Sequence, residues 1–138
     1  MSATLNSDAL GTMVAERTFG PIAREDLRRY AEASGDLNPL HLDPVFARQA
    51  GFDDVIVHGM LGMALLGRLI TETLGPQRLR LLAFRVRFRH VIRTGEAIHC
   101  RARLEARIGE AAVLALEALN PVGTLLIEGT ATVKPLGS

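Results

Sequence analysis

The second half of the chain alternates apolar and polar side chains with a period of two, and this pattern constrains the fold more than any other feature. Residues 84–88 alternate phenylalanine or valine with arginine, and residues 98–108 repeat the alternation over a longer stretch. Successive side chains of a β-strand point to opposite faces of a sheet, so each stretch predicts a strand with one buried face. Turn-forming residues separate the strands that we expect over residues 84–88, 98–108, 112–119 and 125–134.

The first half of the chain is mostly helical in pattern. A short strand is expected over residues 14–19, followed by a helix over residues 22–33 that ends at Gly35, where a residue free to take positive φ is useful. Two prolines make residues 37–44 an ordered but irregular loop, and a helix of one or two turns is expected over residues 44–49.

Residues 59–74 are rich in glycine, methionine and leucine, and we expect a second, longer helix there. This helix is apolar around most of its circumference, which indicates that protein surrounds it. The sequence therefore predicts an α+β fold in which one antiparallel sheet packs against one central helix. A single sheet of four or five strands covers such a helix poorly, so we expect a second copy of the chain to complete the cover as a homodimer.

Composition narrows the class of protein. The formal net charge of +1 gives no argument for nucleic acid or a membrane surface as a partner. The apolar stretch over residues 55–70 is too short, and too often interrupted by glycine and charge, to span a bilayer. The one cysteine, Cys100, lies among alternating apolar residues and is expected to be a small buried side chain. We expect one cytoplasmic domain over residues 1–138, with residues 1–13 as a loose lead-in and no secretory signal.

The loop after the first helix carries the residues best suited to chemistry. Asp36, Asn38 and His41 lie close together on a segment that Pro39 stiffens. If the loop curls, the carboxylate and the imidazole can converge on one water molecule; histidine exchanges protons near neutral pH, and a carboxylate can orient it or share its work. The pattern Asp-x-Asn-Pro is also a turn signature, in which Asp36 and Asn38 would only cap nearby backbone groups.

The second candidate feature is the sequence His58-Gly59-Met60 at the start of the apolar helix. The first N–H groups of a helix have no partner within the helix, and a glycine there admits close approach of a ligand. Such groups can hold the oxyanion that develops when a thioester becomes an enolate. We interpret His58 itself as a structural residue.

Together these segments resemble a known family. The segment from Tyr30 to Ala47 is similar to the signature of the MaoC-like family of (R)-specific enoyl-CoA hydratases, and residues 58–60 resemble the family's helix entry. The matching positions of the first motif are Ser34, Gly35, Asp36, Asn38, Pro39, Leu40 and His41. The order of segments is compatible from about residue 14 to residue 134.

The resemblance implies a hot dog fold, in which an antiparallel sheet wraps around a central apolar helix, usually as a dimer. It implies addition of water to trans-2-enoyl thioesters of coenzyme A or a carrier protein, giving (R)-3-hydroxyacyl products without a cofactor. Asp36 and His41 would bind and activate the water, and Gly59 would offer its N–H to the thioester carbonyl. Asn38 would hold the loop or polarise the site. Which member of the pair takes the proton stays open.

An acyl pocket is expected alongside the apolar helix, where Gly62 and Gly67 leave room and Met63 or Leu66 can line it. The same small residues can instead permit close packing of the helix on the sheet. Arg85, Arg87 and Arg89 lie on one face of a strand, where they meet the phosphates of a coenzyme A or carrier arm or form an ordinary solvated face.

Three other functions compete with the hydratase. These are a dehydratase acting on carrier-bound 3-hydroxyacyl groups, a thioesterase of the same fold, and a non-catalytic subunit that binds acyl thioesters. The presence of both Asp36 and His41 favours an enzyme. A metal site built from Asp36, His41, Asp43 and His58 matches no familiar ligand spacing, so we expect no metal.

Overall fold

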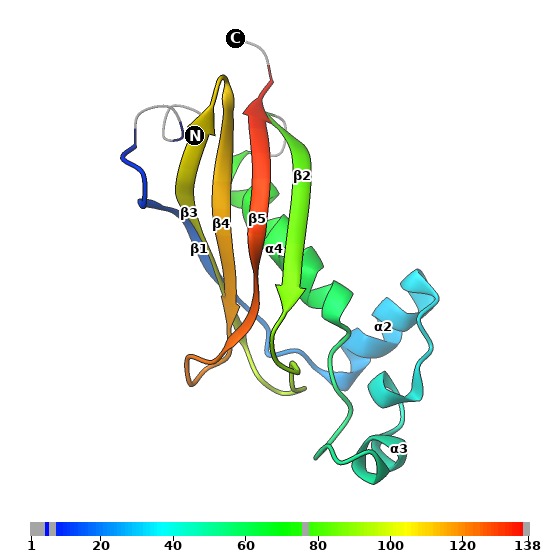
Figure 1. Cartoon of the computed structure of the whole chain (residues 1–138). Coiled ribbons are helices and arrows are strands. Elements are labelled where there is room, and N and C mark those ends of the chain that lie inside the picture. Colours follow the sequence, from blue (N-terminus) through cyan, green and yellow to red (C-terminus); the bar gives the residue numbers. More distant parts are fainter. Residues whose placement is uncertain (1–4, 6–7, 76–77, 137–138) are drawn as a thin grey trace.

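The computed structural model describes residue 5 and residues 8–75 and 78–136, and its central feature is a five-stranded antiparallel sheet (Figure 1). The strands lie in the order β1-β3-β4-β5-β2, so that the strand following the long helix ends the sheet beside the last strand of the chain. Their bounds are Met13–Phe19 for β1, Leu79–Phe88 for β2, Ile98–Ile108 for β3, Ala111–Leu119 for β4 and Leu125–Pro135 for β5.

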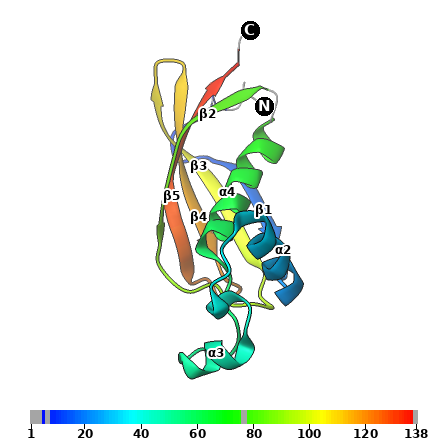
Figure 2. The ribbon, with the colours of Figure 1, turned by 90° about the vertical axis from the view of Figure 1, so that its right-hand side faces the viewer.

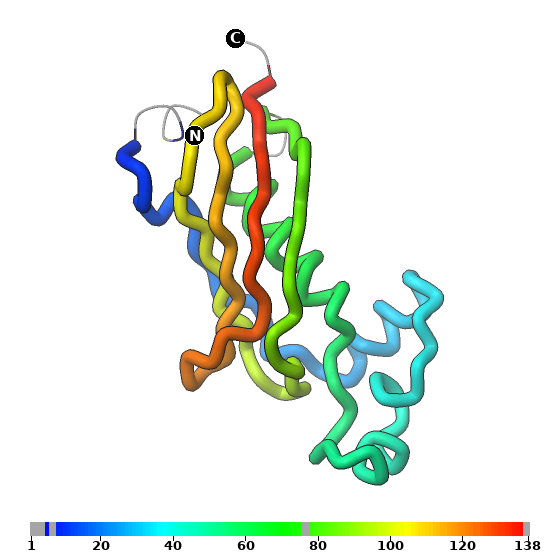
Figure 3. The backbone as a smooth tube through the Cα atoms, viewed as in Figure 1, coloured from blue at the N-terminus to red at the C-terminus, as the bar shows by residue number. Residues whose placement is uncertain are grey.

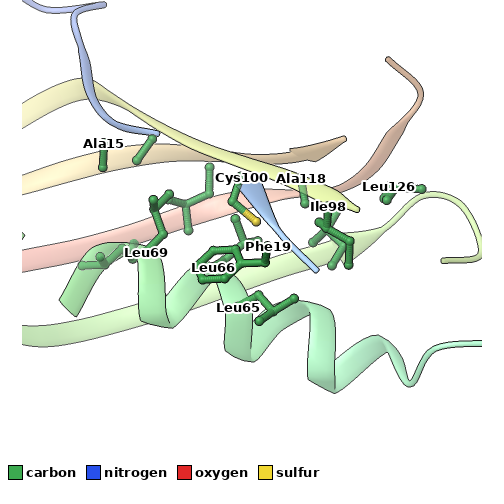
Figure 4. Close-up of a cluster of buried hydrophobic side chains, with 14 of the residues drawn as sticks. Ala15, Phe19, Leu65, Leu66, Leu69, Ile98, Cys100, Ala118 and Leu126 are labelled. Carbon is green, nitrogen blue, oxygen red and sulfur yellow. The ribbon is translucent and has the colours of Figure 1, made fainter. Parts of the chain in front are cut away.

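One long helix, α4 (Gly59–Leu74), packs along the face of the sheet that curls around it (Figure 2). Its buried residues, which include Leu65, Leu66 and Leu69, point at the apolar faces of the strands (Figure 4). Gly62 lies close to side chains of β5 and of the loop after β2: a Cβ there would stand 2.6 Å from Ile127 Cδ1 and 2.8 Å from Ile92 Cδ1. The structure thus supports close packing at this glycine.

Three shorter helical segments lie between β1 and α4: α2 (Arg24–Ser34), a 3-10 turn (Pro39–His41) and α3 (Pro44–Gln49). The segment from α2 to the start of α4 lies at one end of the sheet and extends beyond it (Figure 3). Functional loops are commonly carried on a rigid scaffold in this way. No helix in the described ranges has the length and apolar character needed to cross a membrane.

The predicted α+β fold with a sheet around one apolar helix is confirmed. Two details differ from the sequence-based expectation. Strand β2 begins at Leu79 rather than near residue 84, because its pairing with β5 continues through a register shift between Leu81 and Ala83. Part of the expected loose lead-in is docked on β3: Gly11 N–H donates to the Leu104 carbonyl at 2.6 Å.

Cys100 is fully buried between the sheet and the helix, as expected (Figure 4). Burial raises the pKa of its thiol to about 12, because a thiolate would have to leave water. A thiol that stays protonated at neutral pH is a poor nucleophile, so Cys100 is part of the core.

Candidate active site

The loop that carries Asp36 and Asn38 is built by local hydrogen bonds. Gly35 ends α2 with φ of 80°, a left-handed conformation that favours glycine. Asp36 Oδ1 then accepts the Asn38 N–H at 3.2 Å, and Asn38 Oδ1 accepts the Leu40 N–H at 3.0 Å. The capping role that the turn signature predicts is therefore present. It occupies only one carboxylate oxygen of Asp36, so the other remains available.

That second oxygen faces His41. Asp36 Oδ2 lies 4.0 Å from His41 Nε2, and the side chains are 50% and 12% exposed, respectively. The other ring nitrogen of His41 lies 2.7 Å from the Ile56 carbonyl oxygen. A carbonyl can only accept, so Nδ1 carries the proton and a neutral His41 presents the lone pair of Nε2 to Asp36. The structure brings the two predicted residues together with this tautomer.

A second imidazole lies behind the pair. His58 is 1% exposed, and its ring stacks on that of His41 with centroids 3.9 Å apart and planes 24° apart. Its Nε2–H donates to the Asp36 carbonyl at 3.2 Å. Burial lowers the pKa of His58 below its ordinary value, and the hydrogen bond to Asp36 opposes this only in part.

Gly59, the first residue of α4, lies beside the same site. It lines a pocket of about 340 Å³ together with His41, Ile56, Val57 and residues 88–92. A Cβ at Gly59 would stand 3.1 Å from Phe88 Cε1, so only glycine leaves this ring undisturbed. The Gly59 N–H starts a helix and has no intrahelical acceptor, which leaves it free for a ligand.

The other predicted binding residues lie elsewhere in the structure. Asn38 is exposed on the loop, and Leu66 is fully buried in the core. Met63 and Gly67 are half-buried on α4, and a Cβ at Gly67 would make ordinary contact with the Phe84 ring at 3.5 Å. None of these four lines the pocket that holds His41 and Gly59, so their part in binding an acyl chain stays a prediction.

Sequence reasoning missed the pocket residues 88–92. They belong to the end of β2 and the loop after it, and reach the site because Val57 N–H donates to the Ile92 carbonyl at 2.8 Å. Arg89, predicted to meet phosphates or solvent, lines the pocket and pairs with Glu128 at 2.8 Å. Val91 and Ile92 follow a strand in the sequence, and nothing in their pattern indicates that they lie beside a loop far earlier in the chain.

The geometry also bears on a metal site. Ligand atoms of Asp36, His41 and His58 all lie within 4.8 Å of one another. However, histidine binds a metal through a lone pair in the plane of its ring, at about 2.0–2.1 Å for zinc. Two stacked rings cannot both direct such lone pairs at one ion. Asp43 is occupied elsewhere, because its Oδ1 accepts the Val45 and Phe46 N–H groups at the start of α3.

A curled antiparallel sheet around one apolar helix is the hot dog fold, and here a carboxylate and an imidazole lie near the N-terminus of that helix. Residues 6–119 match the MaoC like domain family. The chain therefore belongs to the MaoC-like hydratase/dehydratase family, whose members are hydro-lyases acting on acyl thioesters of coenzyme A or carrier protein.

Individual relatives agree with this assignment. The (R)-specific enoyl-CoA hydratase of Aeromonas caviae is 31% identical over 111 residues, which cover 79% of this chain and 83% of that enzyme. A mitochondrial 3-hydroxyacyl-[acyl-carrier-protein] dehydratase of Arabidopsis thaliana is 53% identical over 47 residues, 34% of this chain and only 28% of that protein. Among solved structures, the R-hydratase PhaJ1 of Pseudomonas aeruginosa superposes with a TM-score of 0.88 at 28% identity, covering 97% of this chain and 86% of that one.

Proposed function

We propose that this chain is an (R)-specific enoyl-CoA hydratase, which adds water to trans-2-enoyl thioesters to give (R)-3-hydroxyacyl thioesters. The observation that carries the proposal is the separation of 4.0 Å between Asp36 Oδ2 and His41 Nε2, together with the pocket that His41 and Gly59 line. The relationship over most of both chains to the hydratase of Aeromonas caviae supports the same reaction.

One water molecule can bridge the pair. Two hydrogen bonds of about 2.8 Å span a gap of 4.0 Å with an angle near 90° at the water oxygen. The carboxylate and the unprotonated Nε2 both accept, so the water donates both of its hydrogens and turns its lone pairs away from them. A lone pair is then free to attack Cβ of the substrate.

The remaining steps of the proposed reaction move one proton and develop negative charge on the thioester carbonyl oxygen. As the oxygen of water bonds to Cβ, the pair takes one proton, and the electrons of the double bond move toward the thioester carbonyl. In this proposal the N–H of Gly59, at the start of α4, donates to that carbonyl oxygen while it carries negative charge. A proton returned from the pair to Cα completes the hydration, with all atoms of the water accounted for.

We further propose that the enzyme is a homodimer joined through the edge strand β2. In the described part of the sheet this strand pairs only with β5, and it exposes Leu81, Leu82 and Phe88 by 41%, 50% and 50%. An unpaired edge with exposed apolar residues favours pairing with another strand. Because Phe88 also lines the pocket, a partner here would add a wall to it. Light scattering on Leu82→Lys should show a monomer where the parent chain is a dimer; a dimer unchanged by this substitution contradicts the proposal.

A second candidate is the reverse reaction on a carrier protein, supported by the short but 53% identical match to the plant dehydratase. Hydration and dehydration share one transition state, so the same residues serve both. Parallel assays with 3-hydroxyacyl groups on coenzyme A and on carrier protein separate the two substrates.

The direct test of the proposal is loss of enoyl thioester absorbance with crotonyl-CoA and octenoyl-CoA. The parent chain should hydrate at least one of them, and Asp36→Asn and His41→Ala should be strongly impaired. Full activity in both variants would overturn the mechanism, and an inactive parent chain would overturn the assignment as a hydratase.

A further inference from the structure

His58 lies in the site but cannot reach a substrate, because only 1% of it is exposed. It contacts residues of α2, of the loop that follows α2 and of the 3-10 turn. Its face lies on the His41 ring, its Nε2–H donates to the Asp36 carbonyl at 3.2 Å, and the Tyr30 ring of α2 packs against it with centroids 4.7 Å apart and planes 59° apart. One side chain therefore contacts both members of the pair.

A histidine at this position lowers the stability of the fold. Its Nδ1 is buried and has no hydrogen-bond partner among the residues that the structure describes. An unpaired buried polar atom typically costs about 1–3 kcal/mol, whereas an apolar ring of similar shape would avoid this cost. An apolar side chain here would leave only the Asp36 carbonyl without its present donor. Because Asp36 lies on an exposed loop, water can replace that donor. Stability alone therefore favours phenylalanine over histidine at position 58.

We propose that His58 is a positioning residue for the Asp36–His41 pair, with one ring edge holding the Asp36 backbone and one face setting the plane of the His41 ring. This role rests on the proposed function, since it is defined by the water that the pair binds. Two contacts from one rigid ring fix the gap between the two acceptors, and errors of about 1 Å in such a gap can cost about a hundredfold in rate.

The charge of His58 matters as well as its shape. Tyr30, Asp36 and His41 are the titratable residues that face it, from α2, the loop and the 3-10 turn. A positive charge on His58, stacked on the His41 ring, would oppose the transfer of a proton to that ring. Burial keeps His58 neutral, as the lowered pKa of this residue reflects.

The test compares His58→Phe with His99→Phe. The first keeps an aromatic face against His41 and removes the N–H donated to Asp36. The second makes the same substitution on β3, where His99 is bonded to Thr18 and Glu16 rather than to the site. We expect His58→Phe to lower kcat for crotonyl-CoA by about 10- to 100-fold with KM within about twofold, and to melt at or above the temperature of the parent chain. His99→Phe should keep the parent kcat. An unchanged kcat in a folded His58→Phe variant overturns the proposal.

Nuclear magnetic resonance of the parent chain with ¹⁵N-labelled imidazoles tests the same idea without a variant that must fold. At pH 7.5 His58 should be neutral with its proton on Nε2, and His41 should carry a proton on Nδ1. A protonated His58 at this pH, or a proton on its Nδ1, overturns the proposal. If the parent chain hydrates no enoyl thioester, the proposed function fails by itself, while the resonances still report on the arrangement of the rings.

Discussion

Removing Asp36 and His41 together should cost little more activity than removing the more important of the two alone. The reason is the gap of 4.0 Å between Oδ2 and Nε2, which makes both groups acceptors of one water molecule. Without either acceptor, that water loses its orientation. The remaining group then has nothing correctly placed to activate.

The magnitudes follow from what a general base contributes. Asp36→Asn and His41→Ala should each lower kcat by about 10²- to 10⁴-fold, equivalent to about 3–5 kcal/mol. Independent residues would multiply to about 10⁴- to 10⁸-fold. For a shared water we expect the double variant within about tenfold of the worse single variant, because residues that act as a unit are not additive. Asp36→Asn is a clean perturbation, since the asparagine oxygen can still accept the Asn38 N–H that shapes the loop.

The assay is steady-state hydration of crotonyl-CoA by the parent chain, both single variants and the double variant, at equal folded concentration. Melting temperatures serve as the control: Asp36→Asn should melt within a few degrees of the parent chain, because Asp36 is half-exposed and its loop bonds persist. A double variant whose loss equals the product of the single losses would refute the shared water.

Four further predictions concern other parts of the molecule. Gly67→Leu should reduce activity on octenoyl-CoA more than on crotonyl-CoA if an acyl chain lies along α4, and equal losses would remove that idea. Gly129→Ala should lower the melting temperature by about 10 °C, corresponding to about 3 kcal/mol, because its Cβ would meet the Arg85 carbonyl oxygen at 2.0 Å; a melting temperature within about 2 °C of the parent chain would contradict this packing. Cys100 should resist iodoacetamide at pH 8 in the folded protein and react fully in denaturant, since its pKa is about 12; rapid labelling of the folded chain would show that the thiol is accessible. Folding lowers the pKa of His58 from 6.5, so the unfolded chain binds an extra proton below about pH 6.5, and the free energy of unfolding should fall there by up to about 1.4 kcal/mol per pH unit. Urea unfolding between pH 7.5 and pH 5.5 should therefore show a shallower fall for His58→Phe than for the parent chain. Equal slopes for the two proteins would disprove the linkage.

Local patterns were sufficient to predict most elements of the fold. The alternation over residues 98–108 predicts β3 with its correct bounds, because the side-chain direction in a strand depends only on the position along it. The apolar segment 59–74 matches α4, and Gly35 ends α2 as expected. Asp36 and His41 were identifiable because the loop that joins them is short and its order of residues is specific.

Contacts between distant segments could not be predicted in this way. Whether Gly62 leaves room or allows close packing depends on Ile92 and Ile127, which lie on other elements. Leu66 is fully buried among residues of other elements, and the helical pattern alone does not indicate which ones. Periodicity indicates which face of a helix is apolar, but the order of the strands decides what that face meets.

The sequence by itself determined the type of fold and the choice of Asp36 and His41 as candidates for activating water, because both depend on neighbours along the chain. Only the tertiary structure decided the tautomer of His41, through the Ile56 carbonyl, and the contact of His58 with both members of the pair. These depend on how the loop, the start of α4 and the end of β2 converge at one end of the sheet. Convergence is set by packing in three dimensions, which a one-dimensional pattern does not encode.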